Sequence, residues 1–392
     1  MGKCRLCGSK NVELLIDFGM QPIVHKLKKD KDFIDEKFPF RLGHCKRCDF
    51  LQIMECIAPE ILYENYFTLS NWKNQPHVSR LIEVMQSIAG EDYNANILEV
   101  GCNDGSFLSV LRDRGYINLH GVEPTKDAYK KTVELGLDVA NTFFSKSFVD
   151  TKYAKNSFDI VITRQVLEHI GDLEDFMLSM DYVLSDAGKL IIEIPDSRLN
   201  IESLDYGLWE EHVNYFTITT LKILLAKYGF RVIHHESTLF SGKALLAFCE
   251  KSSNIKELAY ENIDRKNILN YKNSWQIYKT NLQEFLKAQT RPIAIYGCGA
   301  RSSTFVNFTG IAEYIEVFID DQQEKQNLFL PCANISIQPW DEKYREYVIL
   351  LGVNTENEYK VITKRALERS RTFSILQPSS LVPKFWKDMI HD

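Results

Sequence analysis

The sequence predicts an α/β protein, and three observations lead to this prediction. Apolar runs of strand length alternate with helical patterns through residues 96–196, the arrangement expected of a parallel sheet covered by helices. A glycine-rich turn follows a predicted strand twice, at Gly101 and at Gly297. Two Cys-x-x-Cys pairs occupy the first fifty residues. We therefore expect an N-terminal metal-binding module, a central Rossmann-like domain and a second Rossmann-like domain at the C-terminus.

The composition is that of a globular chain with several domains. The 392 residues are 45% hydrophobic and 26% charged, and the formal net charge is −6. We place the domains at residues 1–65, 66–252 and 253–392. The acidic balance, without a long basic run, disfavours binding to nucleic acid polymers or to a membrane surface. No apolar segment reaches the ~18 residues needed to span a bilayer, and no signal peptide is evident, so we expect a cytoplasmic protein.

Two cysteine pairs of the same spacing lie near the N-terminus. Cys4 and Cys7 form the first pair, and Cys45 and Cys48 form the second. Two residues between thiolates let one turn direct both sulfurs at a single ion, and two such turns complete the tetrahedral shell that Zn²⁺ prefers. A closed shell leaves no position for water, so we expect a structural zinc ion rather than a catalytic one. A redox-active dithiol is the alternative.

The central domain begins with a strand, a glycine turn and a helix. Residues 96–100 form the predicted strand, and the turn Gly101–Gly105 joins it to a helix over residues 106–114. The next predicted strand ends in Glu123, ~20 residues beyond the first turn glycine, where a carboxylate can accept hydrogen bonds from two ribose hydroxyls. This spacing suits any adenosyl ligand, including NAD.

Acidic and amide side chains around the turn discriminate between these ligands. Glu99 precedes the turn, and Asn103 and Asp104 lie within it. A dinucleotide turn brings backbone N–H groups to a pyrophosphate and avoids carboxylates, whereas S-adenosylmethionine has no phosphate and carries a cationic sulfonium and an ammonium group. The side chains therefore favour S-adenosylmethionine. With the strand Phe158–Ile162, the segment Glu99–Gly105 resembles the motifs of the class I methyltransferases.

Two further segments are expected at the cofactor site. Phe144 can place its ring against the adenine, with core packing as an equal alternative. Residues 163–170 are expected to begin a helix whose first turn faces the ligand at the carboxyl ends of the strands, which makes Gln165 and His169 candidate pocket residues. The complete set that we expect to bind the cofactor is Glu99, Gly101, Asn103, Gly105, Glu123, Phe144 and Gln165.

A cluster of reactive side chains follows the fifth predicted strand, residues 190–195. Residues 208–217 combine two carboxylates, a histidine, an amide and aromatic rings just past a strand end, where α/β proteins keep their chemistry. Histidine is the natural proton acceptor near neutral pH, and Glu211 can orient the ring of His212 and raise its basicity. A surface loop with a salt-bridged histidine is the alternative.

The cluster resembles the Tyr-His-Glu-His-Phe-x-Tyr-Phe stretch of the zinc-containing C-methyltransferases that act on nucleotide-linked 4-keto-deoxysugars. The resemblance extends over nearly the whole chain and includes both cysteine pairs, residues 17–22, Tyr66-Phe67 and Val166–His169. Trp209 and Glu210 depart from the family pattern, which has tyrosine and histidine at these two positions. The hydroxyl expected near the substrate is therefore lost.

The resemblance implies a function and a set of site residues. It implies transfer of a methyl group from S-adenosylmethionine to carbon of a nucleotide-diphosphate ketosugar, with His212 as the base. Glu211, His169 and Tyr66 are then expected beside the substrate. Carbon is a poor nucleophile unless a proton α to a carbonyl is removed, so the base would generate an enolate whose oxygen is stabilised by polar donors. Three alternatives remain: methylation of oxygen or nitrogen on a similar sugar, an NAD-dependent nucleotide-sugar oxidoreductase, and a non-catalytic zinc-anchored scaffold.

The C-terminal part repeats the strand, glycine turn and helix pattern. Residues 253–290 have helical periodicity, and a strand over 291–296 runs into the turn Gly297–Ser303. A further strand, 314–321, ends in two aspartates. A serine at the third glycine position disfavours a bound NAD. The resemblance implies that this domain helps to hold the nucleotide of the substrate, with Arg301 and Ser302 near its diphosphate, and a scaffold role is the alternative.

Overall fold

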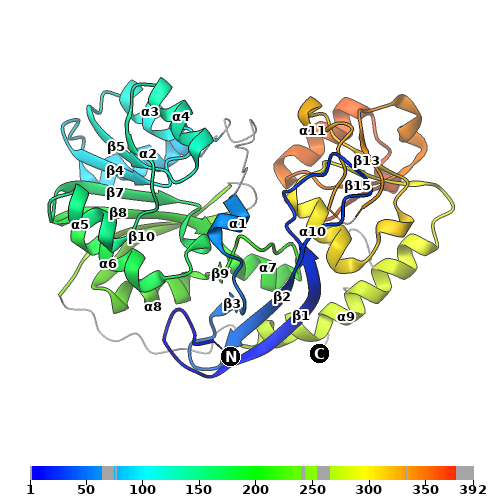
Figure 1. The fold of residues 1–392 in the computed structure, drawn as a ribbon, viewed down its shortest axis with the longest axis horizontal. Coiled ribbons are helices and arrows are strands. Elements are labelled where there is room, and N and C mark those ends of the chain that lie inside the picture. Colours follow the sequence, from blue (N-terminus) through cyan, green and yellow to red (C-terminus); the bar gives the residue numbers. More distant parts are fainter. Residues whose placement is uncertain are drawn as a thin grey trace.

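Three sheets organise the chain, for which the computed structural model describes residues 2–63, 75, 77–239, 243–253, 265–331 and 333–376. The central and C-terminal sheets form two lobes, joined below by the N-terminal strands β1 and β2 and by helix α9 (Figure 1). Within these residues, no helix is long and apolar enough to cross a membrane.

The N-terminal sheet is antiparallel and has the order β1-β2-β3-β9. Its strands are β1 (Val12–Pro22), β2 (Lys37–Cys45), β3 (Leu51–Ile53) and β9 (Asn214–Tyr215), and the short helix α1 (Pro59–Tyr63) follows β3. The last strand comes from the predicted reactive cluster, because Gln52 pairs with Asn214 and Leu51 pairs with Tyr215. The N-terminal module is therefore completed by residues from the central part of the chain.

The central sheet has seven strands in the order β10-β11-β8-β7-β4-β5-β6, with a parallel core and antiparallel pairs at β8-β11-β10. Its strands are β4 (Asn96–Val100), β5 (Asn118–Val122), β6 (Asp138–Ala140), β7 (Phe158–Arg164), β8 (Leu184–Pro195), β10 (Phe230–Leu239) and β11 (Lys243–Lys251). Its helices are α2 (Val78–Ala89), α3 (Ser106–Asp113), α4 (Lys126–Glu134), α5 (Lys146–Lys152), α6 (Leu173–Val183), α7 (Ser197–Ser203) and α8 (Ile218–Lys227).

The helix expected from residue 163 is not formed there. Strand β7 continues to Arg164, and only a 3-10 turn, Leu167–His169, precedes α6. Gln165 has a φ of 55°, a left-handed conformation that interrupts a helix, and Asp172 caps the N-terminus of α6 by accepting from the backbone of Glu174. The predicted pocket residues still follow the carboxyl end of β7.

The C-terminal sheet is parallel, with the order β14-β13-β12-β15-β16. Its strands are β12 (Ile293–Tyr296), β13 (Val317–Ile319), β14 (Ile337–Gln338), β15 (Val348–Leu351) and β16 (Thr372–Ser374), and its helices are α9 (Arg265–Lys287), α10 (Ala300–Thr309) and α11 (Thr355–Arg365). Short 3-10 segments cover Ala312–Tyr314, Gln323–Lys325, Glu342–Glu346 and Arg369–Arg371. The repeated strand and turn pattern thus corresponds to a second α/β unit.

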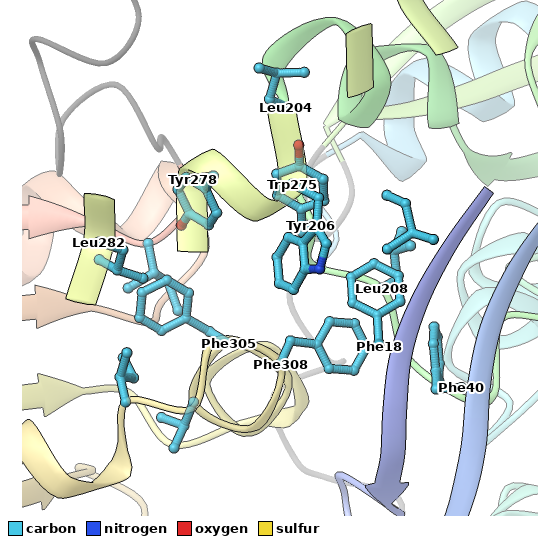
Figure 2. Close-up of a cluster of buried hydrophobic side chains, with 14 of the residues drawn as sticks. Phe18, Phe40, Leu204, Tyr206, Leu208, Trp275, Tyr278, Leu282, Phe305 and Phe308 are labelled. Carbon is cyan, nitrogen blue, oxygen red and sulfur yellow. The ribbon is translucent and has the colours of Figure 1, made fainter. Parts of the chain in front are cut away.

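An aromatic cluster joins the N-terminal sheet to the C-terminal lobe (Figure 2). Phe18 of β1 stacks on Phe308 of α10 with ring centroids 4.2 Å apart, and it meets Trp275 of α9 edge-on at 4.8 Å. Tyr206, which follows α7, stacks on Tyr271 at 4.5 Å. Because each buried aromatic ring contributes about 1.5–3 kcal/mol relative to exposure, this shared core holds together segments that are distant in sequence.

Candidate active site

The four N-terminal cysteines form one cluster that fits a zinc ion. The Sγ atoms of Cys4 and Cys48 lie 3.6 Å apart, as do those of Cys7 and Cys45, and all four lie within 4.8 Å of one another. Tetrahedral Zn–S bonds of ~2.3 Å place sulfurs about 3.8 Å apart. Each pair is followed by a residue with positive φ, Gly8 or Asp49, whose N–H bonds back to the first cysteine carbonyl. Two turns of the same design therefore face a single ion.

Arg5 connects this cluster to the reactive stretch. It lies between Cys4 and Cys7, and its Nη2 donates to the carbonyl oxygens of Ile53 and Val213, each at 2.7 Å. Its Nε donates to Asn214 Oδ1 at 3.0 Å. A planar guanidinium with three acceptors in its plane fixes their relative positions. The turn that would hold the metal therefore also fixes the backbone next to His212.

A cavity of about 740 Å³ opens between the three parts of the chain. N-terminal, central and C-terminal residues all contribute to its wall. The wall includes most of the predicted site residues, namely Glu99, Gly101, Asn103, Glu123, Gln165, His169, Glu211 and His212, together with His25, Glu168, Arg164, Trp209 and Arg301. The cavity thus joins the expected cofactor turn to the expected catalytic cluster.

The turn after β4 has the geometry of an adenosyl-ligand site. Gly101 has a φ of 75°, and a Cβ there would collide with the side chain of Val166, so only glycine fits. Glu123 accepts from the backbone N–H groups of Asn103, at 3.0 Å, and Thr125, at 2.8 Å, which fixes its carboxylate at the end of β5. A carboxylate held there is placed to accept from ribose hydroxyls.

The burial and hydrogen bonding of Glu99 indicate a site for a cationic ligand. The residue is 2% exposed, and its Oε2 has no hydrogen-bond partner among the described residues. Burial raises the pKa of its carboxyl to about 8, although Arg164 acts in the opposite direction. A buried carboxyl oxygen without a partner costs free energy unless a ligand satisfies it. The ammonium group of S-adenosylmethionine is such a ligand, so these residues fit the cofactor.

Two predicted cofactor residues lie away from the cavity wall. Phe144 is buried and packs edge-on against Phe176 with centroids 5.6 Å apart, whereas its neighbour Phe143 is exposed and lines the cavity. The structure therefore puts Phe143, rather than Phe144, where a ring can reach an adenine. Gly105 is the N-cap of α3 with a φ of 76°, and a Cβ there would press on Thr132 and Leu137.

The predicted catalytic histidines lie together. The rings of His169 and His212 are perpendicular, with centroids 4.8 Å apart, and Trp209 covers His212 at 4.1 Å. The backbone around them is fixed, because Val213 N donates to Glu168 O and Asn214 Nδ2 donates to Ile170 O. The 3-10 turn after β7 and the stretch before β9 therefore form one unit. Tyr66, also predicted here, lies outside the described residues.

Glu211 has a partner that sequence reasoning missed. It was expected to orient His212, but its Oε1 lies 2.5 Å from Nδ1 of His25, which comes from the N-terminal module. Burial acts to raise the pKa of Glu211, and the hydrogen bond and charge of His25 outweigh it, so the pKa falls below its ordinary value. The pKa of His25 is raised in turn, because Glu211 and Glu210 outweigh its burial. No local pattern links residues 25 and 211, so only the fold could reveal this pair.

The two central histidines are held neutral. Burial lowers the pKa of His212 well below its ordinary value, and the positive charge of Arg301, with that of His169 whenever it is protonated, adds to this effect. Burial also lowers the pKa of His169, although Glu211 opposes it. A neutral imidazole offers one acceptor and one donor nitrogen. The pair can therefore take up a proton at one ring and donate a hydrogen bond from the other.

Three family models match successive parts of the chain. Residues 72–235 match the family model described as "Methyltransferase domain", residues 4–63 match "Putative zinc binding domain", and residues 250–377 match "C-methyltransferase C-terminal domain". The chain is 21% identical to the C-methyltransferase NovU of Streptomyces niveus over 97% of its own length and 96% of that protein. It is 25% identical to a ubiquinone biosynthesis O-methyltransferase of Rickettsia bellii over 30% of this chain and 50% of the relative.

Part of the chain also aligns with a solved structure. The 1,6-didemethyltoxoflavin-N1-methyltransferase of Burkholderia thailandensis aligns with a TM-score of 0.41 at 13% identity, covering 54% of this chain and 99% of that one.

Zinc content tests the cysteine cluster. We expect about one zinc ion per chain, and Cys45→Ser should remove it because three thiolates no longer close the tetrahedral shell. Cys56→Ser is the matched control, because Cys56 is exposed and lies outside the cluster. The measurement is elemental analysis of purified protein by mass spectrometry. Full zinc content in Cys45→Ser, or loss of zinc from Cys56→Ser, would contradict the assignment.

Proposed function

We propose that this chain methylates a carbon atom of a nucleotide-linked ketosugar. It is an S-adenosylmethionine-dependent methyltransferase that joins a zinc-binding segment to a C-methyltransferase C-terminal domain. The observation that carries this proposal is a neutral histidine, His212, in the same cavity as the cofactor turn. A base is needed at this place because carbon attacks the methyl group only after a proton α to a carbonyl has been removed.

His212 is the residue that we assign as this base. Its low pKa keeps the ring unprotonated at neutral pH, so an acceptor nitrogen is available. Trp209 packs on the ring at 4.1 Å and restricts its orientation. The hydrogen bond from His212 N to Trp209 O, at 3.1 Å, fixes the backbone of the same turn. When bound, S-adenosylmethionine supplies the electrophilic methyl group.

His169 is the group that we assign to the carbonyl oxygen of the substrate. It is neutral, lines the cavity and lies beside His212. A donor aimed at an oxygen that gains negative charge stabilises the enolate more than the ketone. The negative charge of Glu211, which pairs with His25, acts on His169 and raises its pKa against the effect of burial. The N-terminal module thus contributes a positioning residue to the reaction.

Arg301 is the residue that we assign to the diphosphate of the substrate. It stands in the first turn of α10, lines the cavity and lies 5.7 Å from the ring of Trp209. A guanidinium pairs well with phosphate oxygens. Ser302, expected to assist it, is instead fully buried and donates to Gly297 O at 2.5 Å. The side of the cavity formed by the C-terminal domain therefore offers Arg301 for the nucleotide part.

The glycine turn of the C-terminal domain gives little support to an NAD-dependent reaction. Asp320, at the position where a dinucleotide fold would bind ribose, is 6% exposed. It accepts from the backbone of Cys298 at 2.7 Å and of Gln322 at 2.9 Å, and from Lys325 Nζ at 3.2 Å. Unlike Glu123, which lines the cavity, Asp320 does not line it, and its carboxylate is held in a buried ion pair with Lys325. A scaffold role fits this turn better than a dinucleotide site.

The pH dependence of kcat/KM tests the role of His212. We expect the acidic limb to have its midpoint below the ordinary histidine value of 6.5, because burial and nearby positive charge disfavour the imidazolium ion. Arg301→Gln removes one of these charges, which raises the pKa of His212 and moves the limb to higher pH. A midpoint that stays fixed or moves to lower pH in the variant would argue against this base.

Product analysis tests the reaction itself. A panel of 4-keto nucleotide sugars is incubated with S-adenosylmethionine, and mass spectrometry with fragmentation locates any added methyl group. We expect methylation on carbon, and His212→Ala should lower the rate at least about 100-fold, the usual contribution of a general base. His235→Ala, an exposed histidine on β10, is the control and should retain the wild-type rate. Methylation on oxygen or nitrogen, or full activity of His212→Ala, would overturn the proposal.

A further inference from the structure

A buried arginine stands in a place where a cationic ligand is expected. Arg164 ends β7, is 9% exposed and lines the cavity next to the glycine turn, since Thr163 pairs with Val100 at the end of β4. The carboxyl groups around the turn suit the sulfonium and ammonium groups of S-adenosylmethionine. A positively charged side chain among these carboxyl groups does not suit such a ligand, unless the ligand also carries an anionic group.

Arg164 is oriented by a buried network behind the cavity wall. Its Nε donates to Glu193 Oε2 at 3.1 Å, and its Nη2 donates to Gln75 Oε1 at 2.5 Å. Its Cζ lies 4.6 Å from the centre of the Phe107 ring. Glu193 is fully buried and does not line the cavity, whereas Gln75 and Phe107 do. The network therefore holds the guanidinium at the wall with an amide and an aromatic ring beside it.

The position of Arg164 matches one end of the cofactor. Glu123, the expected ribose ligand, directly follows β5 on one side of β4, and Arg164 ends β7 on the other side. Glu99 lies on β4 between them, with its Oε1 3.8 Å from Nη1 of Arg164. A ligand whose ribose reaches Glu123 therefore crosses the glycine turn with its amino-acid end directed at Glu99 and Arg164.

We propose that Arg164 binds the α-carboxylate of S-adenosylmethionine, with Gln75 beside it, while Glu99 accepts from the α-ammonium group of the same ligand. A zwitterion is recognised by a cation and a carboxylate that lie close together, and Arg164 Nη1 lies 3.8 Å from Glu99 Oε1. Burial raises the pKa of Glu99, and a bound ammonium group favours the ionised form of this carboxyl. The arrangement accounts for the arginine in an acidic pocket. It makes Arg164 a cofactor-binding residue that discriminates the intact amino-acid end from truncated adenosyl compounds. The inference depends on the cofactor alone and holds whatever the methyl acceptor is.

Calorimetry with two probes tests this assignment without turnover. One probe is S-adenosylhomocysteine, which has the full amino-acid end. The other is S-adenosyl-3-thiopropylamine, which keeps the amine but lacks the carboxylate. We expect Arg164→Gln to weaken binding of S-adenosylhomocysteine by about 10- to 100-fold, as for a lost charge-assisted hydrogen bond. Binding of the amine probe should change less than about threefold, because the carboxylate that the arginine would hold is absent from it.

Two further variants keep the test decisive. Thr238→Val removes the 3.0 Å hydrogen bond from Thr238 Oγ1 to Glu193, and thus perturbs the same network from a residue that is not part of the cavity wall. It should leave the ratio of the two affinities unchanged. Arg164→Lys retains a cation beside Glu193 if the glutamine variant does not fold, and a selective loss of about 3- to 10-fold is expected because the planar fork is absent.

Three outcomes of these measurements would contradict the assignment of Arg164. Equal weakening of both probes by the Arg164 variants would show that the arginine only maintains the shape of the pocket. Unchanged binding of S-adenosylhomocysteine would remove Arg164 from the cofactor site. A selective loss in Thr238→Val as large as that in Arg164→Gln would assign the effect to the network rather than to the guanidinium. Each of these outcomes would overturn the proposal.

Discussion

The hydrogen bonds of Arg5 are the constraint on which the rest of the active site depends. The stretch that carries His212, the proposed base, contains only the two-residue strand β9, too little regular structure to fix a side chain by itself. Arg5 reaches the carbonyl of Val213 and the side chain of Asn214 from between two cysteines of the zinc cluster. A metal in the four-cysteine cluster can therefore determine where the proposed base lies. This explains physically why a structural zinc module accompanies a methyl-transfer domain.

The cavity wall carries carboxyl groups on one side, and imidazoles and a guanidinium on the other. Carboxyl groups of Glu99 and Glu123 surround the glycine turn, which suits a ligand with positive sulfur and nitrogen. The other half has neutral imidazoles and Arg301, which suit a carbonyl group and an anionic nucleotide. Because the two halves share one cavity, the methyl donor and the proposed acceptor can bind next to each other. The ion pair of His25 and Glu211 closes the N-terminal side of the second half.

Patterns local in sequence were predictable, and contacts between distant segments were not. The repeated cysteine spacing predicted the four-sulfur cluster, and strand and glycine patterns predicted both α/β units, because each depends on residues within one short segment. The helix expected after β7 was wrong, since the left-handed conformation of Gln165 has no sequence signature of its own. His25 and Arg164 were missed because their significance depends on Glu211 and Glu99, which lie far away in the chain. The departure at Glu210 was visible in the sequence, but its hydrogen bond from Val24 N was not.

Proton exchange at carbon, in the absence of methyl transfer, tests the central claim most directly. An accepted 4-keto nucleotide sugar is incubated in deuterium oxide with the enzyme and S-adenosylhomocysteine, and mass spectrometry follows deuterium at the carbon α to the ketone. If His212 removes that proton, the wild-type enzyme incorporates deuterium and His212→Gln does not. Exchange by His212→Gln at the wild-type rate, or no exchange by a wild-type enzyme that still methylates the sugar, would contradict the account.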